Sequence, residues 1–234
     1  MNLTPQKLAG ATSADAPLGS RGVEWTGPGI AATASGVAPT QMSYLGKDFF
    51  ERETVTVAQG LIGARLIVGA CEGRIVEAEA YTTDAASHAV TRRNQASSMR
   101  DTYGHVYVYF TYGMYHCLNF TTERDGIGAV LIRAVEPLKG VAEMARRRGT
   151  TNRQKLASGP GMLCQAFGID LSFNGEPLGK SVKLRERSDT PAISASTRIG
   201  ISQATGLMWR FYETGNSFVS AQRKANIRPG KDSG

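Results

Sequence analysis

Five short segments with the alternation typical of β-strands follow one another between residues 65 and 135, and they constrain the fold more than any other feature. They span residues 65–68, 74–81, 105–110, 115–120 and 129–135. A glycine-rich turn at 70–73 joins the first two, a turn at 111–114 joins the next two, and a polar turn at 121–128 leads into the last. Segments connected in this way predict a mostly antiparallel sheet.

Helices are expected on both sides of these strands. Residues 141–148 and 160–167 have helical patterns, the second with Pro160 near its first position. The segment from Asp48 begins a further candidate helix, although its β-branched residues weaken that prediction. Residues 82–104 read as a long polar loop, and the pairs 211–212 and 218–219 as a last pair of strands. We therefore expect one α+β domain.

Composition separates this domain from two tails. Residues 1–42 are rich in alanine, glycine and proline and have little apolar periodicity, so we predict a flexible low-complexity tail there, a domain over 43–222 and a basic flexible tail over 223–234. The chain has 27 basic and 20 acidic residues, and the charges of residues 1–42 cancel, so the whole net charge of +7 belongs to residues 43–234. Such an excess suits nucleic-acid binding, and it also serves solubility.

The expected environment is the reducing interior of a cell. The three cysteines cannot all pair within one chain, and none forms a CxxC motif. The first residues lack the apolar core of a signal peptide, and the uncharged run 25–46 is broken by prolines and glycines, which argues against a membrane helix. We expect an intracellular protein without membrane association, in the cytoplasm or nucleoid if the source is bacterial.

The strand 74–81 carries two acidic side chains on one face. Alternation places Glu77, Glu79 and Tyr81 together, with the small apolar residues on the other face. A solvated strand face is the default explanation for any such Glu-x-Glu pattern, so the signal is weak on its own. The functional alternative is a general base, in which one carboxylate deprotonates a water for attack on an electrophilic carbon.

Tyrosines are concentrated in the predicted hairpin, since five of the eight fall between residues 103 and 115. A well-packed hairpin would account for most of them. Tyr107 and Tyr109 share a strand face, whereas Tyr112 falls in the turn beside Gly113, where an aromatic ring is badly placed for burial and well placed for a partner. On a basic protein the natural partner is a stack of nucleic-acid bases.

Other polar candidates are His88 in the long loop, Asn119 on the same face as Tyr115 and Cys117, and Arg133 within an apolar strand, where it needs a partner. The three histidines show no metal-binding spacing, and the sequence contains no nucleophile elbow, phosphate-binding glycine loop or dinucleotide fingerprint. We expect chemistry without a metal or an organic cofactor.

Several motifs together resemble the alkyladenine (3-methyladenine) DNA glycosylase family. They occur in the family's order from about residue 45 to 220, at 74–81, 86–88, 106–115, 131–138, 157–166, 198–201 and 210–212. The resemblance implies a compact α+β domain with a curved sheet, peripheral helices and a protruding hairpin that presses into DNA.

The resemblance also implies roles for matched positions. Glu79 resembles the general base that activates the hydrolytic water, and Arg133 the partner that orients it. Tyr81 and Tyr109 resemble the walls that stack a flipped base, with His88 completing the pocket. Asn119 resembles the residue that crowds the exocyclic amine of guanine, and Tyr112 the wedge that fills the gap in the duplex.

The resulting hypothesis is a monomeric, monofunctional glycosylase that acts on double-stranded DNA containing alkylated or deaminated purines. Rotating such a base out of the duplex costs a few kcal/mol, and this cost is smallest for bases that pair or stack poorly. Two alternatives are a non-catalytic protein that binds damaged DNA, and a glycoside hydrolase that uses Glu77 and Glu79. The second is disfavoured because neighbouring acids on one strand cannot readily flank a sugar bond.

Overall fold

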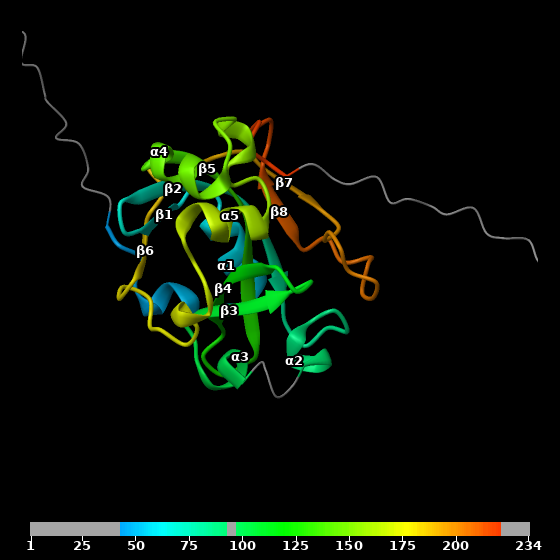
Figure 1. Cartoon of the computed structure of the whole chain (residues 1–234). Helices are drawn as coiled ribbons and strands as arrows, with labels where there is room; N and C mark the ends of the chain where they lie inside the picture. Colours follow the sequence, from blue (N-terminus) through cyan, green and yellow to red (C-terminus); the bar gives the residue numbers. More distant parts are fainter. Residues whose placement is uncertain (1–42, 93–96, 221–234) are drawn as a thin grey trace, which may run out of the picture. The chain divides into compact units, whose positions relative to one another are not determined.

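The computed structural model describes residues 43–92 and 97–220 (Figure 1). The tails predicted at 1–42 and 223–234 lie outside the described residues. None of the helices in the described part combines the length and the apolar character needed to span a bilayer.

Within the described residues, eight strands form one curved sheet in which every pairing is antiparallel (Figure 1). Six of them follow the order β3-β4-β5-β2-β1-β6, while β8 pairs with both β2 and β7. The strands are β1 (Arg65–Val68), β2 (Cys71–Tyr81), β3 (Val106–Thr111), β4 (Tyr115–Thr122), β5 (Gly128–Lys139), β6 (Val182–Arg185), β7 (Ile193–Ser196) and β8 (Arg210–Glu213). With the helices around it, this sheet confirms the α+β class.

β2 is the central strand that later carries the acidic side chains. One edge pairs with β5 along most of its length. The other edge pairs with β1 through residues 71–74 and with β8 through residues 77–79. Glu77 and Glu79 are therefore flanked by strands on both sides, and neither side chain is exposed to solvent.

Short helices cover the sheet. They are α1 (Thr54–Leu61), α2 (His88–Thr91), α3 (Ser97–Asp101), α4 (Val141–Arg148) and α5 (Pro160–Phe167), with 3-10 turns η1 (Lys47–Phe50), η2 (Arg153–Lys155) and η3 (Leu171–Phe173). α4 and α5 have the predicted bounds, and each ends at a glycine with positive φ. The main core contains Phe50 and Leu61 from the first helices and Leu163 and Phe167 from α5.

Three predictions about elements were wrong. The segment expected as one loop contains α2 and α3, and the buried Ser87 side chain caps α2 by accepting from the Ala89 N–H. The turn between β1 and β2 is shorter than expected, because Gly69 adopts positive φ and β2 already begins at Cys71. β8 pairs with β7 rather than with residues 218–219, which belong to no strand. β7 has the sequence Ile-Ser-Ala-Ser, and its two apolar residues, Ile193 and Ala195, are the exposed ones, so it buries no apolar face.

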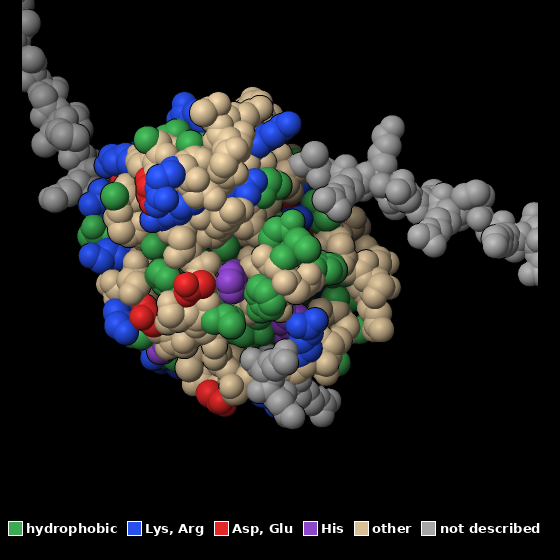
Figure 2. Space-filling model, viewed as in Figure 1, with side chains coloured by type: hydrophobic (Ala, Val, Ile, Leu, Met, Phe, Trp, Pro, Cys, Tyr) green, Lys and Arg blue, Asp and Glu red, His purple; other side chains and the backbone are tan. Residues whose placement is uncertain are grey.

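The β3–β4 hairpin ends in an exposed aromatic turn. Thr111 lies opposite Tyr115, and both Tyr112 and Gly113 between them have positive φ, 52° and 66°. The Tyr112 side chain is 79% exposed and Met114 is 65% exposed. Hydrophobic side chains gather over this end of the hairpin in Figure 2. The turn therefore presents apolar surface to solvent, as predicted for Tyr112.

Candidate active site

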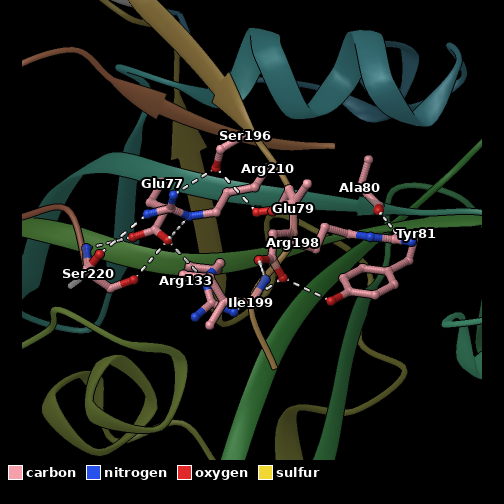
Figure 3. A network of polar contacts seen from close by, with 11 residues as sticks. Glu77, Glu79, Ala80, Tyr81, Arg133, Ser196, Arg198, Ile199, Arg210 and Ser220 are labelled. Atoms are coloured by element: carbon pink, nitrogen blue, oxygen red, sulfur yellow. Dashed lines mark hydrogen bonds and ion pairs between the residues drawn. The ribbon is translucent and has the colours of Figure 1, made fainter. Parts of the chain in front are cut away.

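Glu79 lies in β2 with its carboxylate held by three hydrogen-bond donors (Figure 3). The Tyr81 hydroxyl donates to Oε2 over 2.8 Å, and Arg133 Nη1 donates to the same oxygen over 3.2 Å. The backbone N–H of Ile199 donates to Oε1 over 2.7 Å. All three partners donate, so the carboxylate is held as an acceptor and in a fixed orientation.

Glu77, Glu79 and Tyr81 share one face of β2, as the alternation predicted. That face is buried, which excludes the solvated strand that would otherwise explain the Glu-x-Glu pattern. Arg133 comes from β5 and contacts both acids: its Nε donates to Glu77 over 3.0 Å and its Nη1 to Glu79. Burial lowers the pKa of Arg133, but the charges of Glu79 and Glu77 outweigh this effect and raise it, so Arg133 stays cationic.

A cavity of about 960 Å³ opens beside this acidic pair. Its lining includes six of the seven predicted site residues, namely Tyr81, His88, Tyr109, Tyr112, Asn119 and Arg133. Glu79 is the exception, because it is fully buried behind Tyr81, Arg133 and Ile199, all of which line the cavity. The structure thus brings the predicted residues together around one cavity, and the Glu79 carboxylate lies directly behind the side chains that line it.

Aromatic rings form one side of the cavity. The rings of His88 and Tyr109 are 4.3 Å apart between centroids and meet at 68°. His88 Nδ1 lies 3.0 Å from the Tyr107 hydroxyl. Burial, together with the charge of Arg92, lowers the pKa of His88 to about 4, so its ring is neutral at pH 7. Burial raises the pKa of Tyr107 to about 12, so the hydroxyl keeps its proton.

Asn119 lies on β4 beside these rings and is 3% exposed. Its Nδ2 donates to the Tyr107 carbonyl over 3.0 Å and to the Cys117 carbonyl over 3.2 Å. Both amide hydrogens are therefore used by the backbone, which fixes the side chain against the cavity wall and leaves its carbonyl oxygen as the group it offers to a ligand.

Tyr81 is supported from behind by a residue that the sequence reasoning missed. The Arg198 guanidinium lies 4.5 Å from the centre of the Tyr81 ring. It also pairs with Asp84 over 2.7 Å and donates to the Ala80 carbonyl over 2.9 Å. Arg198 precedes Ile199, so this contact also places the N–H that binds Glu79. The sequence does not mark Arg198 as a site residue, because its ion-pair partner Asp84 lies 114 residues away and no local pattern links the two.

Two further missed residues surround Glu77. Arg210 Nε donates to Glu77 over 2.7 Å, and Ser220 donates through both its N–H and its hydroxyl. Within residues 43–92 and 97–220, no group of three or more His, Cys, Asp or Glu side chains lies close enough together to hold a metal ion.

The fold and this site agree with a known family. The family model described as methylpurine-DNA glycosylase (MPG) matches residues 48–217. The chain belongs to this family, and the resemblance inferred from the motifs is confirmed.

Curated bacterial relatives match most of the chain. One from Chlorobium phaeobacteroides (strain BS1) is 43% identical over 196 residues, which cover 78% of this chain and 98% of the relative. One from Agrobacterium fabrum (strain C58) is 46% identical over 187 residues, covering 78% of this chain and 95% of the relative. Both relatives are provisionally named 3-methyladenine DNA glycosylase.

Proposed function

We propose that this protein is a monofunctional DNA glycosylase that removes alkylated purines of the 3-methyladenine type from duplex DNA, the first step of base-excision repair. The observation that carries the proposal is the Glu79 carboxylate, held by three donors directly behind an aromatic cavity. Family membership and the names of the relatives support the same substrate class.

The cavity receives a purine that has been rotated out of the duplex. Tyr81 and Tyr109 offer aromatic faces for stacking, and the neutral His88 ring offers one donor or one acceptor rather than a charge. The fixed Asn119 side chain crowds the exocyclic amine of a normal guanine, so it selects against undamaged bases.

Tyr112 enters the duplex when the base leaves it. The ring is exposed at the end of the β3–β4 hairpin and lines the same cavity, so it can fill the space between neighbouring base pairs. Arg92 and Arg148 also line the cavity, and Figure 2 shows further basic side chains around α4, whose last turn contains Arg146 and Arg147. These cations suit the phosphates on either side of an extruded nucleotide.

The reaction is the hydrolysis of the N-glycosidic bond. Glu79 accepts a proton from a water molecule, whose oxygen forms a bond to C1′ of the deoxyribose. The bond from C1′ to the purine breaks, and its electron pair neutralises the positive charge of the alkylated base. The products are a free base and an abasic site. None of the described residues that line the cavity is a lysine, which supports simple hydrolysis without a Schiff base. The enzyme acts as a monomer on DNA inside the cell.

The variant Glu79→Gln tests this proposal. A duplex containing 3-methyladenine or 7-methylguanine is incubated with excess protein, and released base and abasic sites are measured. We expect wild-type protein to release the base and Glu79→Gln to lose about 10²–10⁴-fold in rate while still binding the duplex. The exposed Glu186→Gln is the matched control and should react like wild type. If wild-type protein binds the damaged duplex without forming abasic sites, the chain is a damage-binding protein and not an enzyme.

A further inference from the structure

β2 contains three acids: Glu72, which pairs with Arg65 at the start of the strand, and the neighbours Glu77 and Glu79. The proposed mechanism uses Glu79 and leaves Glu77 without a task. Glu77 is fully buried and does not line the cavity. Burying a carboxylate is costly unless charged and hydrogen-bonding partners compensate. The burial of Glu77 beside Glu79 therefore needs an explanation, which its contacts provide.

Four donors surround the Glu77 carboxylate (Figure 3). Oε1 accepts from Arg133 Nε over 3.0 Å, from Arg210 Nε over 2.7 Å and from the Ser220 hydroxyl over 2.8 Å. Oε2 accepts from the Ser220 N–H over 2.6 Å. Four hydrogen bonds use the acceptor capacity of a carboxylate, whereas Glu79, which is equally buried, accepts three and keeps one acceptor position for a water. Glu77 is therefore not a second acid or base at the substrate, which also argues against a glycoside hydrolase that needs two accessible acids.

Arg133 connects the two acids through different edges of one rigid group. Its Nε faces Glu77, and its Nη1 faces Glu79 over 3.2 Å. Because the guanidinium is planar, contacts at two of its nitrogens define its orientation, whereas one contact leaves it free to rotate. The β2–β5 ladder shifts register on both sides of Glu77, so the strands alone hold this region less regularly than elsewhere.

We infer that Glu77 is a positioning residue: it orients Arg133, and through Arg133 the Glu79 carboxylate, while Arg210 and Ser220 hold Glu77 in place. This inference rests on the proposed function. The two glutamates therefore have different tasks: Glu79 deprotonates the water, and Glu77 orients Arg133, which in turn orients Glu79.

The charges give this arrangement a distinctive signature. Two carboxylates and two guanidiniums balance within the cluster of Glu77, Glu79, Arg133 and Arg210. Removal of the Glu77 charge leaves one net positive charge beside Glu79, and protonation of Glu79 becomes less favourable. The titratable and charged groups around Glu79 are Tyr81 and Glu77 from β2, Cys117 from β4, Arg133 from β5, Arg210 from β8 and Arg198 from the segment before β8.

The variant Glu77→Gln is the principal test, with the rate of base release from an alkylated duplex measured against pH under excess protein. We expect the maximal rate to fall about 10²-fold, with the affinity for the duplex unchanged, because a wrongly oriented Glu79 carboxylate slows the reaction without weakening DNA binding. We also expect the acid limb of the profile to move to lower pH. Arg210→Gln removes a positive charge and should move the same limb to higher pH.

A purely structural role would lower the yield of folded protein without moving the acid limb. Glu77→Gln with the wild-type rate and the wild-type acid limb would overturn the inference. The proposed function fails separately, because in that case wild-type protein releases no base and Glu79→Gln changes nothing.

If Glu77→Gln does not fold, Ser220→Ala decides the question, because it removes one donor to Glu77 and retains the carboxylate. We expect a loss of about tenfold in rate with unchanged affinity. Ser217→Ala, three residues earlier on the exposed surface, is the matched control and should keep the wild-type rate. Equal rates for Ser220→Ala and wild-type protein would overturn the inference.

Discussion

His88 shows how a single environment changes what a side chain can contribute. A solvated histidine titrates near neutral pH and could donate a proton to a leaving base. Here burial, helped by the charge of Arg92, lowers the pKa of His88 to about 4, and its Nδ1 faces the Tyr107 hydroxyl. His88 is therefore a neutral group of the cavity and a poor proton donor at the pH of a cell.

This lowered pKa predicts a pH-dependent stability. In the unfolded chain, His88 titrates near its usual value of about 6.5. As the pH falls from 7 towards 4, the unfolded state binds a proton that the folded state refuses, so the free energy of unfolding decreases. His88→Gln removes this contribution, and urea unfolding at pH 7 and pH 5 should show a smaller loss of stability for the variant than for wild type. Equal losses in the two proteins would contradict the shifted pKa.

At the scale of elements, the β3–β4 hairpin combines two functions. Its inner part contributes Tyr107 and Tyr109 to the cavity, whereas its turn carries Tyr112 into solvent. The pairing of Thr111 with Tyr115 and two successive residues with positive φ define the turn. Tyr112 and the cavity residues Tyr107 and Tyr109 therefore belong to one paired hairpin.

Tyr112→Ala should separate DNA binding from folding. The ring is mostly exposed, so its loss should leave the melting temperature nearly unchanged. Affinity for a damaged duplex should fall by about 1–3 kcal/mol, the usual contribution of one ring stacked on bases. Fluorescence anisotropy with a labelled duplex measures this change. Met208→Ala, at an exposed apolar residue outside the cavity lining, is the control and should bind like wild type.

The elements also differ in how well the sequence predicted them and the site residues they carry. The strands between 65 and 139 and the helices α4 and α5 follow from local periodicity, because neighbouring strands are joined by short turns. Predicted site residues from these strands, such as Tyr81, Asn119 and Arg133, line one cavity for the same reason. Arg198, Arg210 and Ser220 were missed because their partners lie more than 100 residues away, and a spacing of that length leaves no pattern in the sequence.

At the scale of the whole molecule, the location of the net charge of +7 leads to a specific expectation about binding to DNA. All of it belongs to residues 43–234, and exposed basic side chains lie around α4. Salt bridges neutralise some of them, as between Arg146 and Glu143. The chain nevertheless carries seven more basic than acidic residues, and this excess suits phosphates, whereas a charge that served solubility alone would have no preferred partner.

Binding to an undamaged duplex should therefore weaken steeply with salt. For six or more phosphate contacts, an increase from about 50 to 200 mM salt lowers the affinity roughly 10³-fold or more. The rate of base release from a saturated damaged duplex should stay unchanged. Arg92→Gln, at an exposed residue of the cavity lining, should reduce the slope of log affinity against log salt by about 0.9. A slope near zero for wild-type protein would mean that the charge serves solubility.

The contact between Glu77 and Ser220 has a consequence for the order in which the protein is made. These residues are 143 positions apart, so Glu77 leaves the ribosome roughly ten seconds before the donor that completes its shell. Arg133 and Arg210 are synthesised in turn during that interval, so the shell of Glu77 forms in stages and Ser220 completes it. On the inference that Glu77 orients Arg133, the nascent chain completes this network only when synthesis has passed Ser220. The proposed activity therefore depends on one of the last residues of the domain to be made.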